Sequence, residues 1–163
     1  VGHKVHSSGD YKHRPPREEH SGLRRWVESH GSATPVTLDP PEFPVLGAAF
    51  IHKLHKVGAS VKCLCCGATH IHVMYDSIAG DAKSEIAAAK QFASLKLATR
   101  PGRVFAKDCS VDEINDLNHA RRLWTYILKH ETLESAWIWR YDRDEVPTRE
   151  VIARLLKNVG SRV

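Results

Sequence analysis

Two histidines separated by one residue, His70 and His72, have a spacing that can support chemistry. In a β-strand, residues i and i+2 point to the same side, about 6.6 Å apart along the chain. Two imidazoles placed in this way can converge on one cation. The same alternation is also typical of a half-exposed strand face, so the pair predicts a metal site only together with further ligands.

A tyrosine within a periodic segment, Tyr126, is the second such residue. At about 100° per residue, the helix expected over 115–134 has one apolar stripe, made of Leu117, Ala120, Trp124, Ile127 and Leu128. Tyr126 lies roughly 150° from the centre of that stripe and is expected outside the core. Arg122 lies one turn before it and His130 one turn after it, with Lys129 beside them. A solvated helix face explains each of these residues singly; their combination with the paired histidines favours a site.

Phosphoryl transfer on a nucleic-acid backbone is the chemistry that such a set can perform. Three imidazoles are available as metal ligands, namely His70, His72 and His130. A divalent cation held by them would polarise a nonbridging phosphate oxygen. Tyr126 would attack the phosphorus, and because a phenol has a reference pKa of about 10, it needs a cation such as Lys129 or Arg122 nearby. The predicted product is a covalent phosphotyrosine.

The elements that must position these residues can be read from hydrophobic periodicity and turn residues. The sequence predicts, in order, a strand over 1–8, an insertion or long loop over 10–41, a helix over 42–57, strands over 60–66 and 69–75, a helix over 81–98, a strand over 103–110, the helix over 115–134 and a helix after Pro147. This order is the split βαβ layout of a ferredoxin-like α+β fold. We expect an antiparallel sheet with helices on one face, plus the tyrosine helix.

The paired histidines and the tyrosine helix resemble the motifs of a known family. His70-Ile71-His72 resembles the HUH motif, two histidines around a hydrophobic residue, and the stretch from Tyr126 to His130 resembles the tyrosine helix of single-tyrosine HUH nucleases. Over 1–139, the element order is similar to that of the insertion-sequence and REP-associated tyrosine transposases. The resemblance implies one catalytic domain over 1–146 and a C-terminal helix or tail over 147–163.

The same resemblance implies a metal-dependent single-stranded DNA endonuclease and strand transferase that acts in DNA transposition through a 5′-phosphotyrosine link at hairpin-flanked ends. His70 and His72 would be metal ligands, His130 the third ligand and Tyr126 the nucleophile. The cation would be Mg²⁺ or Mn²⁺, whereas three imidazoles in general suit Zn²⁺, Ni²⁺ or Fe²⁺ better. The protein would be cytoplasmic and bacterial, and either a monomer or a homodimer.

Two departures keep related activities open. The family often has Asn-Pro where this chain has His130-Glu131, and three-histidine sets occur in relaxases. The spacing from Tyr126 to Lys129 is that of rolling-circle replication initiators. A rolling-circle initiator or a relaxase-type nuclease is therefore the alternative enzyme.

Composition and charge fit a nucleic-acid partner. The 163 residues carry 24 Lys and Arg against 19 Asp and Glu, a net charge of +5, and 42% are hydrophobic, which indicates a single packed domain. Further cations precede or flank the tyrosine and are candidate DNA contacts: Lys90, Lys96, Arg100, Arg103, Lys107 and Arg121. The longest apolar run, 45–51, is far short of the roughly 20 residues of a membrane span. No membrane partner and no secretory signal are expected.

The cysteines offer an alternative of another class. With a two-residue turn at Gly67-Ala68, Cys65 would lie opposite His70 and Cys63 opposite His72, a candidate Cys2His2 zinc site. The chain would then be a non-catalytic nucleic-acid-binding module with structural zinc. Cys66 is expected to be a buried small hydrophobe, so the bunched cysteines fit a reducing compartment.

Two further expectations concern side chains outside the site. His52 lies off the apolar stripe of the helix over 42–57 and is expected to face solvent. Trp137 and Trp139 are expected to pack in the core or at an interface, with base stacking as the alternative.

Overall fold

The computed structural model describes residues 36–78, 80–97, 104–106 and 109–160. The chain divides between Pro35 and Val36, and the fold below is that of the second unit. The strand expected over 1–8 and most of the insertion expected over 10–41 lie outside the described residues. Within them, no helix is both long and apolar enough to cross a membrane.

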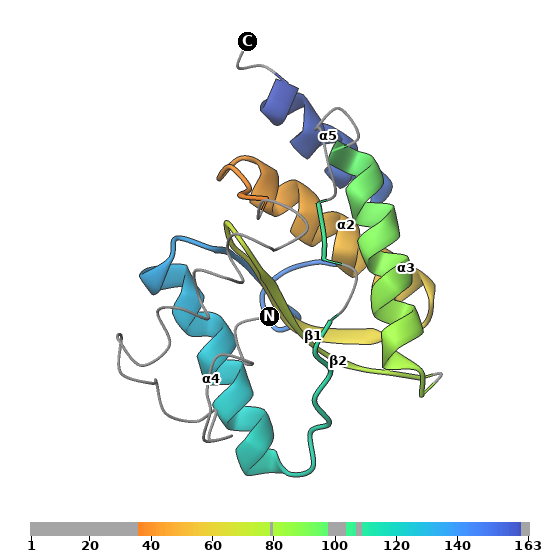
Figure 1. Cartoon of the computed structure of the whole chain (residues 1–163), viewed down its shortest axis with the longest axis vertical. Helices are drawn as coiled ribbons and strands as arrows, with labels where there is room; N and C mark the ends of the chain where they lie inside the picture. The colour runs from red at the N-terminus through yellow and green to blue at the C-terminus, as the bar shows by residue number, and fades with distance from the viewer. Residues whose placement is uncertain (1–35, 79, 98–103, 107–108, 161–163) are drawn as a thin grey trace, which may run out of the picture. The chain divides into compact units, whose positions relative to one another are not determined.

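The fold is α+β, with a three-stranded antiparallel sheet in the order β2-β1-β3 (Figure 1). The strands are β1 (Ser60–Cys66), β2 (Ile71–Asp76) and β3 (Trp137–Arg140). The central strand, β1, therefore has a neighbour on both sides. The arrangement is compatible with the split βαβ, ferredoxin-like layout.

The helices are α2 (Glu42–Lys56), α3 (Ala82–Ser94), α4 (Leu117–Leu133) and α5 (Arg149–Gly160), with a 3₁₀ turn, η2 (Leu95–Leu97), after α3. Local sequence sets their ends. The carboxylate of Asp81 accepts the Ser84 amide at 3.1 Å, and that of Asp116 accepts the His119 amide at 2.7 Å, so each caps a helix start. Gly58, with φ +92°, follows α2 in a backbone conformation that favours glycine, as the sequence predicted.

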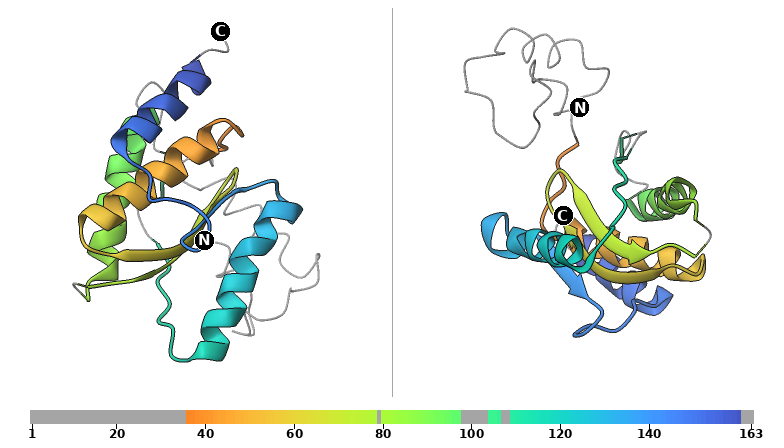
Figure 2. Two further views of the ribbon diagram at one scale, coloured as in Figure 1. Left: turned by 180° about the vertical axis from the view of Figure 1, so that it is seen from behind. Right: turned by 90° about the horizontal axis from the view of Figure 1, so that it is seen from below.

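The sheet separates the helices into two layers (Figures 1 and 2). On one face, Leu64 and Cys66 of β1 pack into the core with α2, α3 and α5. On the other face, Cys63 and Cys65 pack against Ile127 of α4. Alternate residues of one strand thus serve two cores, because successive side chains of a strand point to opposite faces.

The prediction of a strand over 103–110 is wrong for the residues of this range that the structure describes. Residues 104–106 and 109–110 are irregular, and Val104 and Phe105 pack against the core through their side chains. Both edges of β1 are already paired, the second with β3. The sequence predicted packing for Trp137 and Trp139, which is confirmed, but missed that they lie on a strand.

The hairpin has a different register from the predicted one. Cys65 lies opposite His72, and Cys63 opposite Met74. The Gly67 amide donates to the carbonyl of His70 at 3.0 Å, so the ladder continues one pair further and the turn moves by one residue. The two cysteines still face α4, because this change shifts each partner by two residues and preserves the faces.

Leu117, predicted in the apolar stripe, and His52, predicted to face solvent, have the opposite exposure in the structure. Leu117 is 76% exposed because it begins α4, about two turns before the part of the helix that packs on the sheet. His52 is buried, and its Nδ1 lies 2.9 Å from the carbonyl oxygen of Pro147, which leads into α5. The helix predicted after Pro147 is present as α5, and its Ile152 belongs to the same core as α2.

Candidate functional site

Three imidazole rings converge on the face of the sheet that α4 covers. His70 lies at the end of the hairpin turn, His72 lies on β2 and His130 lies near the end of α4. The ring centroids of His70 and His72 are 4.8 Å apart, those of His70 and His130 also 4.8 Å, and those of His72 and His130 5.1 Å. The structure thus brings together the three histidines that the sequence singled out as ligands.

Tyr126 borders this cluster from the solvent side. Its ring meets His130 edge-on, with centroids 5.1 Å apart at 90°, and meets His72 at 5.3 Å and 68°. Tyr126 is 50% exposed, as expected from the sequence, whereas His130 is 7% exposed. The phenol is therefore open to a ligand from solvent while its ring contacts two of the imidazoles.

A candidate metal cluster joins a cysteine to two of the three histidines. One ligand atom each from Cys65, His70 and His130 lies within 4.8 Å of the other two, and this cluster could hold a metal ion. His72 and Cys63 lie outside this set. The cluster therefore shares Cys65 and His70 with the predicted zinc alternative, and His70 and His130 with the predicted nuclease site.

Glu134 also belongs to the site, although the sequence analysis did not single it out. Its carboxylate lies 3.4 Å from Nε2 of His70 and 3.3 Å from Nδ1 of His130. It follows α4 directly, where Ser135 adopts φ +52° and the Ala136 amide returns to the carbonyl of His130 at 3.1 Å. The spacing of four residues from His130 was the available signal, because such residues are neighbours on one helix face.

The ring nitrogens of the cluster are prepared for a cation. Nε2 of His70 and both ring nitrogens of His130 are buried and make no hydrogen bond among the described residues, although Glu134 lies 3.4 Å from the first and 3.3 Å from Nδ1 of His130. Nδ1 of His70 lies 3.3 Å from Oγ1 of Thr69, which leaves Nε2 directed at Glu134. Because buried polar atoms without partners are costly, these nitrogens fit the binding of a metal ion.

Burial favours the neutral forms of His70, His72 and Cys65. It lowers the pKa of His72 to about 4, with the neighbouring His70 and His130 lowering it further. It also lowers the pKa of His70, against the opposing effect of Glu134. Burial raises the pKa of the Cys65 thiol to about 11, with the His72 backbone opposing this shift. Neutral imidazoles can bind a cation directly, whereas the thiol must lose its proton.

Among the described residues, the cations that the sequence singled out, Arg122 and Lys129 as catalytic residues and the others as DNA contacts, lie in both layers of the fold. Arg121, Arg122 and Lys129 are exposed on α4, the helix that carries Tyr126. Lys90 and Lys96 belong to the other layer: Lys90 donates to the carbonyl of Ala106 at 3.1 Å, and the Lys96 amine lies 4.5 Å from the ring centroid of Phe92. The remaining members of the set lie outside the described residues: Arg100, Arg103 and Lys107.

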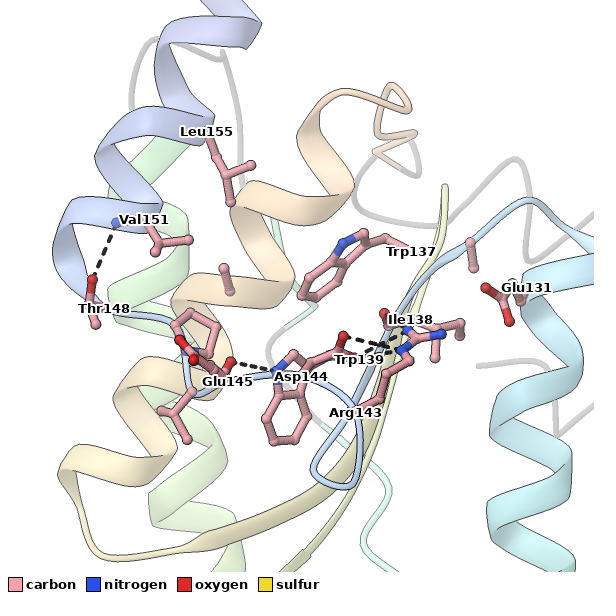
Figure 3. Close-up of a pocket in the computed structure, with 14 residues that line it drawn as sticks. Glu131, Trp137, Ile138, Trp139, Arg143, Asp144, Glu145, Thr148, Val151 and Leu155 are labelled. Atoms are coloured by element: carbon pink, nitrogen blue, oxygen red, sulfur yellow. Dashed lines mark hydrogen bonds and ion pairs between the residues drawn. The ribbon is translucent and has the colours of Figure 1, made fainter.

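A pocket of about 500 Å³ lies between β3, α5 and the loop that joins them (Figure 3). Trp137, Trp139 and Leu155 are among the side chains that line it, and the indole of Trp139 donates to the carbonyl of Glu145 at 3.0 Å. Neither Tyr126 nor any of the clustered histidines lines this pocket. The candidate site is instead the partly open surface between α4 and the end of the hairpin.

Comparisons of the chain with protein-family models, with curated proteins and with solved structures gave no match.

Proposed function

We propose that this protein is a metal-dependent single-stranded DNA endonuclease and strand transferase that uses Tyr126 as its nucleophile. The observation that carries the proposal is the half-exposed phenol of Tyr126 in edge contact with His72 and His130, beside a cluster that could hold a metal ion. A nucleophile and a cation must reach one phosphate together, and here both are available from one surface.

In the proposed reaction, the Oη atom of Tyr126 forms a bond to phosphorus and the bond from phosphorus to the 3′ oxygen breaks. The phenol proton leaves to solvent, and the released 3′ oxygen takes up a proton to become a hydroxyl group. A divalent cation bound among His70, His72 and His130 would stabilise negative charge on a nonbridging oxygen. Arg122 and Lys129 lie one turn from Tyr126 on α4 and place positive charge near the same phosphate.

The substrate class follows from the sequence resemblance and the basic helix α4. We propose single-stranded or hairpin DNA as the partner and transposition in the bacterial cytoplasm as the process. The phosphotyrosine bond to the 5′ end would conserve the energy of the broken phosphodiester bond for a later rejoining step. Mg²⁺ or Mn²⁺ is the cation that the resemblance suggests. A homodimer that exchanges its tyrosine helices is compatible with this activity, as is a monomer.

Two other functions use the same residues. A rolling-circle initiator or a relaxase would form the same tyrosine adduct, and the spacing of Tyr126 and Lys129 favours it. A non-catalytic nucleic-acid-binding module with structural zinc is favoured by Cys65, which joins the histidine cluster. Only this last candidate leaves Tyr126 without a chemical role.

Replacement of Tyr126 by Phe tests the proposal. The assay incubates the protein with Mg²⁺, Mn²⁺ or Zn²⁺ in separate reactions and a panel of labelled single-stranded hairpin oligonucleotides, and detects the covalent adduct on a denaturing gel. We expect Tyr126→Phe to abolish the adduct and to leave DNA affinity within about twofold, because only the hydroxyl is removed. Tyr141→Phe is the matched control, since Tyr141 is also exposed, at 61%, and its ring meets Trp124 rather than the clustered histidines His70, His72 and His130.

The outcomes separate the candidates. An adduct that persists in Tyr126→Phe contradicts the role of this tyrosine. A wild-type protein that binds the oligonucleotides but forms no adduct on any of them favours the zinc-containing binding module.

A further inference from the structure

Cys65 lies beside the histidine cluster, on the face of the sheet that α4 covers. It is on the central strand, is fully buried and faces α4. Its sulfur and one ring nitrogen each of His70 and His130 are within 4.8 Å of one another. Nε2 of His130 is buried without a hydrogen-bond partner among the described residues, and Glu134 contacts the other nitrogen of that ring, so this imidazole has a nitrogen that needs a ligand.

The dimensions suit a small tetrahedral centre. With metal–nitrogen bonds of about 2.0 Å and metal–sulfur bonds of about 2.3 Å, ligand atoms around one ion lie about 3.5 Å apart. The observed limit of 4.8 Å exceeds this by little more than 1 Å. His70 can provide the movement because it sits at the hairpin turn with its side chain 28% exposed.

Charge balance gives a second reason to include the thiol. Three neutral imidazoles would leave the full charge of a divalent cation against buried apolar groups, which is unfavourable. A thiolate from Cys65 compensates one positive charge. The carboxylate of Glu134, at 3.4 Å from His70 and 3.3 Å from His130, compensates the other.

We infer that Cys65 is a metal ligand together with His70 and His130, and that the site therefore selects Zn²⁺ over Mg²⁺ and Mn²⁺. Thiolate and imidazole ligands favour Zn²⁺, whereas the two harder cations prefer oxygen ligands. On binding, the sulfur–hydrogen bond of Cys65 breaks, a sulfur–zinc bond forms and the proton goes to solvent. The inference rests on the proposed function for the role of the metal in catalysis and changes its site: Cys65 replaces His72 as a ligand, and Zn²⁺ replaces the Mg²⁺ or Mn²⁺ that the resemblance suggests. Metal binding can be measured without DNA.

Co²⁺ provides the test, because it replaces Zn²⁺ in such sites and gives a near-ultraviolet charge-transfer band when a thiolate binds it. The metal-free full-length protein is titrated with Co²⁺ under reducing conditions, and Zn²⁺ affinity is then measured by competition with a chromophoric chelator. We expect the wild-type protein to show the thiolate band, Zn²⁺ to displace Co²⁺, and excess Mg²⁺ to leave the band unchanged.

Cys65→Ser and Cys65→Ala are the informative variants, and Cys63→Ser is the matched control. Cys63 is on the same strand, faces the same helix and is equally buried, but it is outside the ligand cluster. We expect either change at Cys65 to remove the band and weaken Zn²⁺ binding by roughly 100-fold or more, with Cys63→Ser close to wild type. Circular dichroism of the metal-free variants verifies that they fold.

A wild-type protein without a thiolate band overturns the inference, and so does a band that survives in a folded Cys65 variant or disappears in Cys63→Ser. Should both Cys65 variants fail to fold, the wild-type band and its persistence in Cys63→Ser, Cys66→Ser and Cys109→Ser assign the thiolate by elimination. Tyr126→Phe separates this result from the proposed function. A band without a DNA adduct supports the metal site while contradicting the nuclease.

Discussion

The carboxylate of Glu134 lies 3.3 Å from Nδ1 of His130, one helical turn before it, and 3.4 Å from Nε2 of His70 on the hairpin. One acidic side chain thus connects two imidazoles that come from different elements. It can fix the orientation of the His130 ring so that Nε2 faces the remaining ligands.

Glu134→Gln should weaken metal binding without removing a protein ligand. We expect Zn²⁺ affinity to fall by about 10- to 100-fold, because an uncharged amide balances less of the cation's charge. The Co²⁺ thiolate band should persist. Glu131→Gln is the control, since it removes the same charge from the same end of α4, and an equal loss in both variants would contradict a specific role for Glu134.

The metal-free protein should lose stability as the pH falls from about 6.5 to about 4. The pKa of His72 is 6.5 in its unperturbed state and is lowered to about 4 by burial, so between these values the unfolded chain binds more protons than the folded one. The groups that face this ring are His70, His130, Tyr126, Glu134 and Cys65. Urea unfolding with a chelator at several pH values measures the effect, and His72→Asn should flatten it. An unchanged pH dependence in His72→Asn would assign it to other groups.

Gly47→Ala should destabilise the fold although alanine favours a helix. A Cβ atom at Gly47 of α2 would overlap the ring of Trp137 on β3. We expect a loss of about 1–3 kcal/mol in the free energy of unfolding, because overpacking outweighs the gain of about 1 kcal/mol in helix propensity. Trp137→Leu should make the alanine tolerable. Additive effects in that double-mutant cycle would contradict the contact.

DNA affinity should depend on the layer that carries each cation. Under the proposed function, Arg122→Ala should weaken binding of a single-stranded oligonucleotide several-fold at low salt and reduce the salt dependence by roughly one counterion. Lys96→Ala should have a smaller effect, because Lys96 lies on η2 in the layer opposite α4 and over the Phe92 ring. Fluorescence anisotropy at several salt concentrations measures both. Equal effects would mean that DNA does not approach through α4.

Much of the fold could be predicted because its signals are local. Periodicity indicated α2, α4 and the hairpin, and the end of α2 at Gly58 followed from a single residue. The short β3 was missed, although Trp137 and Trp139 alternate with residues of the opposite face. A four-residue strand has too few alternations to distinguish it from packed aromatic side chains in a loop.

The sequence by itself determined which side chains share a face. The spacing of His70 and His72, and of Tyr126 and His130, is a property of strand and helix geometry and needs no other part of the chain. The sequence therefore predicted that Tyr126 lies outside the core, and it identified the candidate histidine ligands.

Only the tertiary structure decided which of these faces meet. The pairing of Cys65 with His72 depends on a turn placed one residue later than the sequence indicated, and the approach of His130 depends on α4 packing across the sheet. Glu134 meets His70 because the end of α4 lies beside the hairpin. The contacts of α4 with the hairpin join residues far apart in the chain, and the packing of whole elements, which no local spacing encodes, brings them together.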